Sequence, residues 1–234
     1  MGLPLKTGLV ALMIMGACAD GTGGGGGFRL ALPKPAPKQI TVSGKDVIIA
    51  GPAGFCVDPT VTQSKGSNAF VLLGSCAAIS NSPRKPRPKI PAILTATVSE
   101  TTDSAPIASS MEALTQFFNS ETGRAALSRD GKADMVDVIE TLGKDGVFYI
   151  HARDRSTDTL AGTGDEYWRA LFDVKGRIVS ASVFGLKQRP FSTTAGFDTL
   201  EAFTNQIKSK NAANPVRNNT GIPFLNRLFK KDPV

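Results

Sequence analysis

Histidine and cysteine are scarce in this sequence, and the scarcity excludes several chemistries. His151 is the one histidine among 234 residues, so neither a multi-histidine zinc site nor an H-E-x-x-H protease motif can form. The three cysteines show no C-x-x-C spacing, which argues against a thiol oxidoreductase. The G-x-S-x-G nucleophile elbow is also missing. We therefore expect no metal site and find no obvious nucleophile.

An apolar run long enough to span a bilayer is missing at the N-terminus as well. Residues 8–17 are apolar, but they are far fewer than the roughly 20 residues that cross a membrane. They follow Lys6, and a short apolar run behind a basic start is typical of a signal peptide. We therefore predict that residues 1–17 are a signal peptide and that the protein leaves the cytosol.

Two kinds of processing fit the end of this leader. Met15-Gly16-Ala17-Cys18 resembles the lipobox of bacterial lipoproteins, which implies a lipid anchor on Cys18. In those proteins Ala19, rather than Asp, after the cysteine implies sorting to the outer membrane. Ala17-Cys18-Ala19 also fits the small-x-small rule of ordinary signal cleavage, which would remove Cys18 and release a soluble secreted protein.

Glycine and proline dominate residues 18–38. The run GTGGGGG occupies residues 21–27, and Pro33, Pro35 and Pro37 follow it. Glycine-rich sequence forms a flexible coil and proline-rich sequence a stiffer one, so we predict a tether to a folded domain. The glycines lack the Lys-Ser/Thr ending of a phosphate-binding loop, and no cofactor is predicted.

Both kinds of processing leave one pair of cysteines, Cys56 and Cys76. In an oxidising compartment we expect them to form a disulfide. It would close a loop of about 20 residues and add about 3 kcal/mol to the free energy of unfolding. Two buried free thiols are the alternative if the chain stays in the cytosol.

Residues 39–211 are predicted to form a single α+β domain. Strands are expected at residues 40–42, 47–50, 69–73 and 93–98. Two helices follow, with Ser110 and Ser120 as N-caps and the second ending at Leu127. A four-stranded meander is expected at residues 136–142, 147–153, 167–174 and 177–184. A last helix should begin at Asp198 or Thr199 and end near Asn211, so the fold is an antiparallel sheet covered by helices.

Two resemblances accompany this element order. Residues 54–59 (GFCVDP) and 69–76 (AFVLLGSC) resemble a group of uncharacterised exported proteins of alphaproteobacteria. The order of elements is similar to that of PsbP-like domains, in which helices cover a sheet. The first resemblance spans two short segments and implies no activity. The second is an analogy of fold, and a fold does not define a function.

The candidate catalytic groups lie on the expected strand 147–153 and on the loop of residues 154–166 that follows it. Asp154, Asp158, Asp165 and Glu166 could frame the carboxylate pair that glycoside hydrolysis needs, with Asp165 and Glu166 as weak candidates. His151 is expected to be an ordinary residue of a sheet face, with a titrating role as the alternative.

The chain is basic, with a formal net charge of +7. Arg84, Lys85, Arg87 and Lys89 lie in the proline-rich residues 82–91, which we expect to form an exposed loop. Such a loop could bind an envelope protein, an anionic glycan or a lipid, or it is simply a solvated loop.

The predicted C-terminal tail, residues 212–234, contains a short amphipathic segment at residues 223–231. The segment could dock on its own domain, or it could contact a membrane or a partner. Nucleic acid is not an expected partner, because an exported chain without a stacking motif of the RNP type has little means to bind it.

Together these features predict a bacterial envelope lipoprotein, lipid-anchored at the outer membrane and facing the periplasm. It would act as a non-catalytic binding or assembly module. The alternatives are a periplasmic hydrolase that uses carboxylates of residues 154–166 and a soluble secreted protein without an anchor. The residues do not identify a ligand.

Overall fold

The structure is mixed α+β, as predicted, and its sheets are antiparallel. The computed structural model describes residues 34–44, 46–65, 68–156, 160 and 162–212. The predicted signal peptide, Cys18, most of the tether, Asp158 and nearly all of the predicted tail lie outside the described residues. None of the described helices has the length and apolar composition that crossing a bilayer requires.

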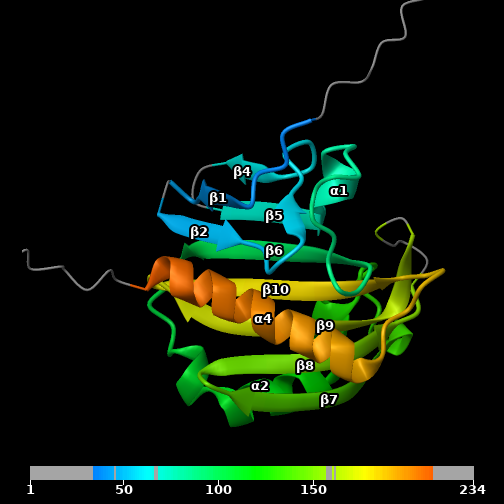
Figure 1. Cartoon of the computed structure of the whole chain (residues 1–234). Helices are drawn as coiled ribbons and strands as arrows, with labels where there is room; N and C mark the ends of the chain where they lie inside the picture. The colour runs from blue at the N-terminus through cyan, green and yellow to red at the C-terminus, as the bar shows by residue number, and fades with distance from the viewer. Residues whose placement is uncertain (1–33, 45, 66–67, 157–159, 161, 213–234) are drawn as a thin grey trace, which may run out of the picture. The chain divides into compact units, whose positions relative to one another are not determined.

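An eight-stranded sheet forms the centre of the domain (Figure 1). Its strands lie in the order β3, β5, β6, β10, β9, β8, β7, and β4 pairs with the first residues of β5. Their bounds are β3 Phe55–Val57, β4 Gln63–Lys65, β5 Asn68–Ser75, β6 Ala92–Thr101, β7 Val136–Lys144, β8 Val147–Asp154, β9 Thr163–Val174 and β10 Arg177–Leu186. Every neighbouring pair is antiparallel.

Two tight turns set the register of the last four strands. Asp145-Gly146 joins β7 to β8, and Lys175-Gly176 joins β9 to β10. All four residues have positive φ, as the two-residue turns that match the twist of a hairpin require. β7 therefore pairs with β8 and β9 with β10 as hairpins, and β8 also pairs with β9.

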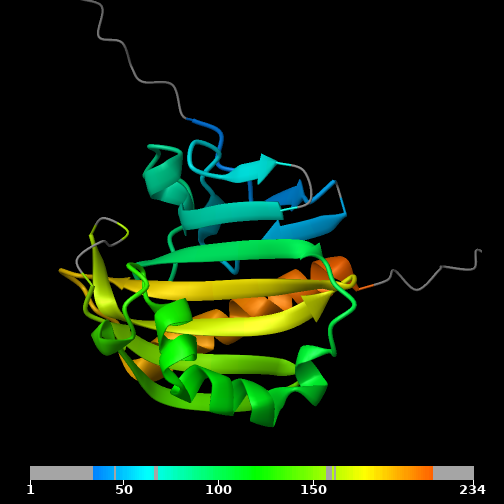
Figure 2. The ribbon, with the colours of Figure 1, turned by 180° about the vertical axis from the view of Figure 1, so that it is seen from behind.

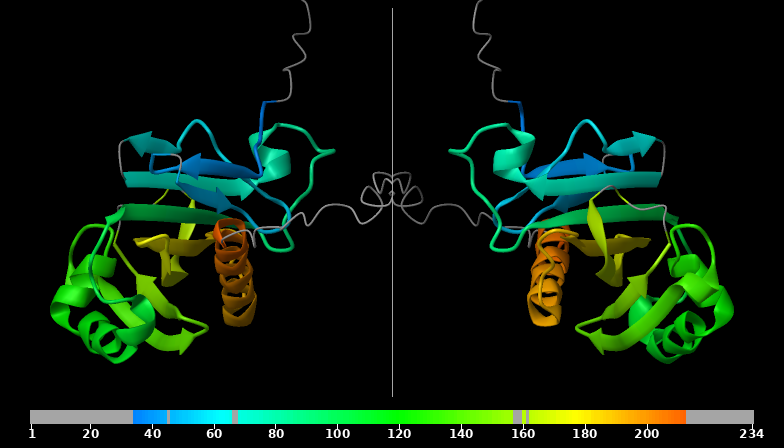
Figure 3. Two further views of the ribbon diagram at one scale, coloured as in Figure 1. Left: turned by 90° about the vertical axis from the view of Figure 1, so that its left-hand side faces the viewer. Right: turned by 90° about the vertical axis from the view of Figure 1, so that its right-hand side faces the viewer.

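One face of the sheet is covered by α4 (Thr193–Asn211) and by a separate hairpin of β1 (Gln39–Val42) and β2 (Val47–Ala50) (Figures 1 and 3). The larger hydrophobic core lies between these elements and the sheet. The alternation along β9 points Trp168, Ala170 and Phe172 into this core, where the apolar side chains of α4 meet them. Leu200, Phe203 and Ile207 of α4 are fully buried there.

The opposite face is covered over part of its width (Figure 2). The covering elements are η1 (Ile107–Ser109), α2 (Met111–Asn119), α3 (Glu121–Leu127) and η2 (Ala133–Met135). They pack a smaller core over β7, β8 and β9, in which Phe118 stacks on Phe148. Over β5, β6 and the centre of β10, no helix of the described residues lies against this face.

The predicted disulfide is confirmed: Cys56 of β3 is bonded to Cys76 of α1 (Cys76–Ile79). The two Cα atoms lie 4.8 Å apart, and both residues are buried. Since β3 pairs with β5 and α1 follows β5 directly, the bond fastens the edge of the sheet to the start of the helix.

Several predicted boundaries were wrong. The last helix begins at Thr193, capped by the Ser192 side chain, rather than at Asp198 or Thr199, because the indole N–H of Trp168 donates to the Thr193 carbonyl and fixes the first turn. Strand β9 begins four residues before Tyr167, while β3, β4 and α1 were not predicted.

Of the two serines that were predicted to cap helices, only one does so. Ser120 caps α3 as predicted, since its side chain accepts a hydrogen bond from the Gly123 backbone N–H. Ser110 stands directly before α2, but it forms no side-chain cap. Its hydroxyl donates to the Pro106 carbonyl instead.

Candidate functional site

The uncovered part of the sheet face presents side chains in rows that run across the strands. Leu72 of β5 lies opposite Thr95 of β6, Thr95 opposite Ser182 of β10, and Ser182 opposite Arg169 of β9. Directly opposed residues of antiparallel strands point to the same face, so these four side chains form one row. The row places an apolar group at one end, a cation at the other and two hydroxyls between them.

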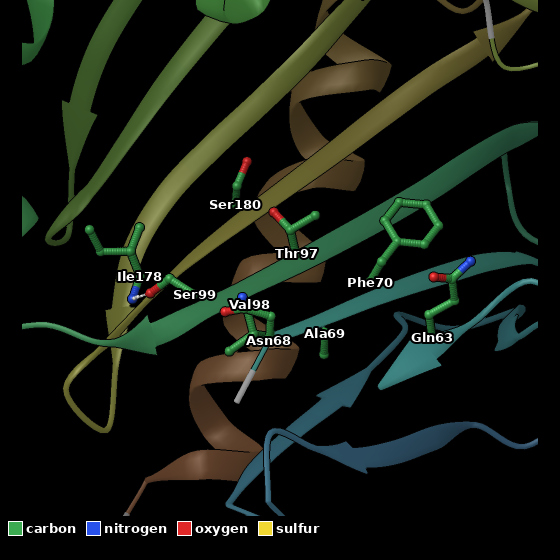
Figure 4. Close-up of a pocket in the computed structure, with 9 residues that line it drawn as sticks. All are labelled: Gln63, Asn68, Ala69, Phe70, Thr97, Val98, Ser99, Ile178 and Ser180. Atoms are coloured by element: carbon green, nitrogen blue, oxygen red, sulfur yellow. Dashed lines mark hydrogen bonds between the residues drawn. The ribbon is translucent and has the colours of Figure 1, made fainter. Parts of the chain in front are cut away.

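A second row runs parallel to the first, two residues further along each strand. Phe70 lies opposite Thr97, Thr97 opposite Ser180, and Ser180 opposite Leu171. Figure 4 shows Phe70, Thr97 and Ser180 on the side of the strands away from α4. The two rows together give β6 and β10 a strip of hydroxyl groups, flanked by apolar side chains on the neighbouring strands.

Two adjoining hollows lie over these rows. One of about 460 Å³ lies over β5, β6 and the start of β10 (Figure 4), and one of about 550 Å³ extends toward β9 and Arg129. Phe70, Thr97 and Ser180 line both, so the hollows form one open concavity. We call it the open-face site and define it by Phe70, Thr95, Thr97, Arg169, Ser180 and Ser182.

Two arginines line this site, and their charges are compensated differently. Arg129 forms an ion pair with the buried carboxylate of Asp154, with 3.7 Å between Nε and Oδ2, and donates from Nη2 to the Gly164 carbonyl. Arg169 donates from Nε to Ser182 Oγ at 3.0 Å and lies over the ring of Tyr167. No carboxylate in the described part of the chain forms an ion pair with Arg169. Among the described residues, Arg169 is therefore the cation of this site that lacks a carboxylate partner.

Tyr167 supports Arg169 from within the smaller core. Its hydroxyl donates to the Leu127 carbonyl at 3.2 Å, which ties β9 to the end of α3. Burial raises the pKa of this hydroxyl, although the charge of Arg169 partly opposes the rise. The phenol consequently stays protonated at neutral pH and acts as a fixed donor.

Two of the predicted catalytic candidates, His151 and Glu166, lie elsewhere, on the face that α4 covers. His151 is buried and stacks on Trp168, with 4.4 Å between ring centroids. Its Nε2 lies 2.8 Å from Glu166 Oε1, while Arg153 donates to Oε2 at 3.1 Å. Partial burial raises the pKa of Glu166. The hydrogen bonds from Arg153 and His151 lower the pKa by more than burial raises it, so the net shift is downward. A carboxylate held in its ionised form is poorly suited to act as a general acid.

Of the other candidate carboxylates, the two that the structure describes, Asp154 and Asp165, form no hydrogen bond with Glu166. Asp154 is fully buried and accepts hydrogen bonds from the backbone N–H groups of Arg129 and Ser156, so it holds the chain in place. Asp165 is exposed, and with Glu166 it lines a small hollow of about 170 Å³. Among the described residues, no three histidine, cysteine or acidic side chains lie together as metal ligands.

The basic loop, defined by Arg84, Lys85, Arg87 and Lys89, runs between α1 and β6. All four residues are exposed. The middle of the loop is held by a hydrogen bond from the Ala77 backbone N–H to the Pro86 carbonyl. It is therefore attached to the element that carries the disulfide.

These features define an α+β domain whose antiparallel sheet has one covered and one partly open face. Comparisons of the chain with protein-family models, with curated proteins and with solved structures gave no match. The function must therefore be argued from the geometry.

The sequence contained a signal for the open-face site that was not recognised. Hydroxyls occupy every second position along β6, at Thr95, Thr97 and Ser99, and they recur on β10 at Ser180 and Ser182. Alternation of this kind marks a sheet face that no helix covers.

Proposed function

We propose that this protein is a non-catalytic binding module of the bacterial cell envelope, lipid-anchored through Cys18 at the outer membrane and facing the periplasm. One observation supports the binding role above the others: the open-face site. A hollow lined mainly by apolar groups, with a few convergent polar ones, is the usual form of a ligand site. Arg169 supplies the charge within it.

The disulfide supports the extracytosolic part of this proposal. Such bonds form and persist in oxidising compartments and are rare in the cytosol. Cys56 and Cys76 are both buried and bonded, which agrees with export by the predicted leader.

The finer description of the fold is also a proposal. We propose that β7 to β10 are a four-stranded meander within a PsbP-like arrangement. The pairing of each of these strands with the next supports the meander. The helices on both faces of the sheet support the analogy with PsbP-like domains.

The basic loop offers a second contact. The loop that carries Arg84, Lys85, Arg87 and Lys89 is held at Pro86, and these four exposed residues would attract an anionic glycan, lipid or envelope protein. We keep this contact separate from the ligand of the open-face site.

The two alternatives, a hydrolase and a soluble secreted protein, predict different experimental outcomes. A hydrolase that depends on Asp165 and Glu166 would lose turnover on a glycan panel in the Asp165→Asn and Glu166→Gln variants. The ion pairing of Glu166 speaks against that role. A soluble secreted protein would fractionate in the same way with or without Cys18, whereas a lipoprotein would leave the membrane fraction in the Cys18→Ala variant.

The binding role is tested by filling the open-face site. We expect crosslinked envelopes to yield a specific adduct with the wild-type protein and to lose it with Thr97→Trp, because the indole would occupy both hollows. Thr194→Trp, at an exposed position of α4, is the matched control and should keep the adduct. An adduct that survives Thr97→Trp unchanged would rule out this face as the binding site.

A further inference from the structure

We infer that the open-face site binds an amphiphile with one anionic headgroup, of the long-chain carboxylate type, with its headgroup at Arg169 and its chain toward Phe70. This inference rests on the proposed binding function and names the ligand. It is carried by the uneven distribution of charge along the two joined hollows.

The β9 end of the site suits a carboxylate. Arg169 uses Nε for Ser182 Oγ, and its two terminal nitrogens form no hydrogen bond with the described residues. A guanidinium presents its donors in a fixed fork that matches the two oxygens of a carboxylate. The hydroxyls of Ser182 and Thr95 follow in the same row and can donate to the same headgroup.

The charge of the site selects against other headgroups. Arg129 is already balanced by Asp154, so a single positive charge is available for the ligand. No acidic side chain lines either hollow in the described part of the chain, which leaves nothing to hold a cationic group. A single negative charge is therefore the best match.

The other end of the site suits an apolar chain. No charged side chain of the described residues lines the hollow over β5 and β6. Phe70 and Ile178 provide its largest apolar groups, and Figure 4 shows them on different strands of the same face. From β9 to β5 the rows cross three strand spacings, or about 14 Å, a span that a medium-length alkyl chain can cover.

The test compares three probes on the purified full-length protein by titration calorimetry. Dodecanoate has both headgroup and chain, dodecanol lacks the charge, and acetate lacks the chain. We expect dodecanoate to bind most tightly, dodecanol more weakly, and acetate not to compete with dodecanoate at equal concentration.

Variants assign the two ends of the ligand. Arg169→Gln should weaken dodecanoate about tenfold or more and leave dodecanol unchanged, because only the first probe uses the charge. Phe70→Ala should weaken both. Arg84→Gln, which removes an equal charge from the basic loop, is the matched control and should change neither. Thermal unfolding of each variant verifies that it is folded.

Three outcomes would overturn the inference: no binding of dodecanoate, equal affinity of Arg169→Gln and wild type, or acetate competing as well as dodecanoate. Each would leave the binding function standing if the envelope adduct still depends on Thr97. If the envelope adduct persists in Thr97→Trp while dodecanoate still binds the wild type as expected, the result would count against the envelope partner and not against the ligand class.

Discussion

Glu166 lies between two donors, and its ionisation is coupled to folding. Burial alone would raise its pKa, but the hydrogen bonds from Arg153 and His151 bring the pKa below the ordinary value of 4.5. A carboxyl with a lower pKa in the folded than in the unfolded state stabilises the fold above the unfolded-state pKa. That stabilisation is lost as the pH falls through the folded-state pKa.

We therefore expect the wild-type protein to lose thermal stability faster than Glu166→Gln as the pH falls below 4.5. At neutral pH the wild type should be more stable by less than about 1 kcal/mol, because Glu166 is partly exposed and water screens the pair. Calorimetric midpoints measured from neutral to acidic pH give the comparison. Arg153→Gln, which removes one donor, should show part of the effect. A constant difference at every pH would contradict the coupling.

Gly54 controls the position of the basic loop. It has a φ of +87°, and a Cβ there would lie 2.4 Å from the backbone of Arg87 and Pro88. Gly54→Ala would therefore force the loop away as well as strain the backbone. We expect the free energy of unfolding to fall by about 1–3 kcal/mol because of the overlap, and by about 1–2 kcal/mol more because of the left-handed conformation.

Gly131→Ala is the matched variant for this measurement. Gly131 also has positive φ, at +78°, but a Cβ there meets nothing within 4 Å. Urea unfolding followed through Trp168, the single tryptophan, should give the larger loss for Gly54→Ala. Equal losses of unfolding free energy in the two variants would mean that the basic loop moves away from the new Cβ without destabilising the fold.

Among the elements, the hairpin β1–β2 depends on α4 through one side chain. Asn211, the last residue of the helix, accepts a hydrogen bond from the Ile48 N–H at 2.9 Å and donates to the Ile48 carbonyl at 2.7 Å. It also donates to the Ile207 carbonyl within α4. These bonds join segments that are 163 residues apart in the sequence.

We expect Asn211→Ala to destabilise the protein by about 1–3 kcal/mol, since Ile48 would keep backbone groups with no partner. Hydrogen exchange should show the loss of protection concentrated in β1 and β2. Asn205→Ala, at an exposed position of the same helix, should leave the hairpin protected. Uniform loss of protection over the sheet would show that the contact acts globally instead.

At the scale of the whole molecule, the buried face of the sheet was predictable, and so were all the described strands except the three-residue strands β3 and β4. Trp168, Ala170 and Phe172 alternate with more exposed residues, because α4 buries one side of β9 more completely than the other. The start of α4 was predictable only in part, because the Ser192 cap stands in the sequence but the packing that accompanies it does not. Gly196 packs so closely on Phe191 and Trp168 that a Cβ would not fit, and this contact with a distant strand is not visible in the local sequence.

The open-face site was predictable only in part: the alternating hydroxyls of β6 and β10 stand in the sequence, but the set of side chains that forms the site does not follow from them. Its members come from four strands, and only the register brings Phe70, Thr97, Arg169 and Ser180 together. The disulfide was predictable because the count of cysteines after processing left one pair.

The net charge of the chain predicts how the whole molecule meets a membrane surface. We expect adsorption to vesicles that contain anionic phospholipid to weaken as salt is added, because counterions screen exposed charges. Replacing Arg84, Lys85, Arg87 and Lys89 by Gln should weaken the free energy of adsorption by up to about 1 kcal/mol per residue. Cosedimentation measures both effects, with uncharged vesicles as the control. Adsorption indifferent to salt would show that another force dominates.

The hydroxyl groups on β6 and β10 have a consequence for the ligand-free state. A sheet face of purely aliphatic side chains would shed water and adhere to other proteins. Thr95, Thr97 and Ser180 instead keep this face wettable while it is vacant, and the buried Ser182 holds Arg169. Water can therefore cover this face in an aqueous compartment, and a ligand that binds there displaces that water.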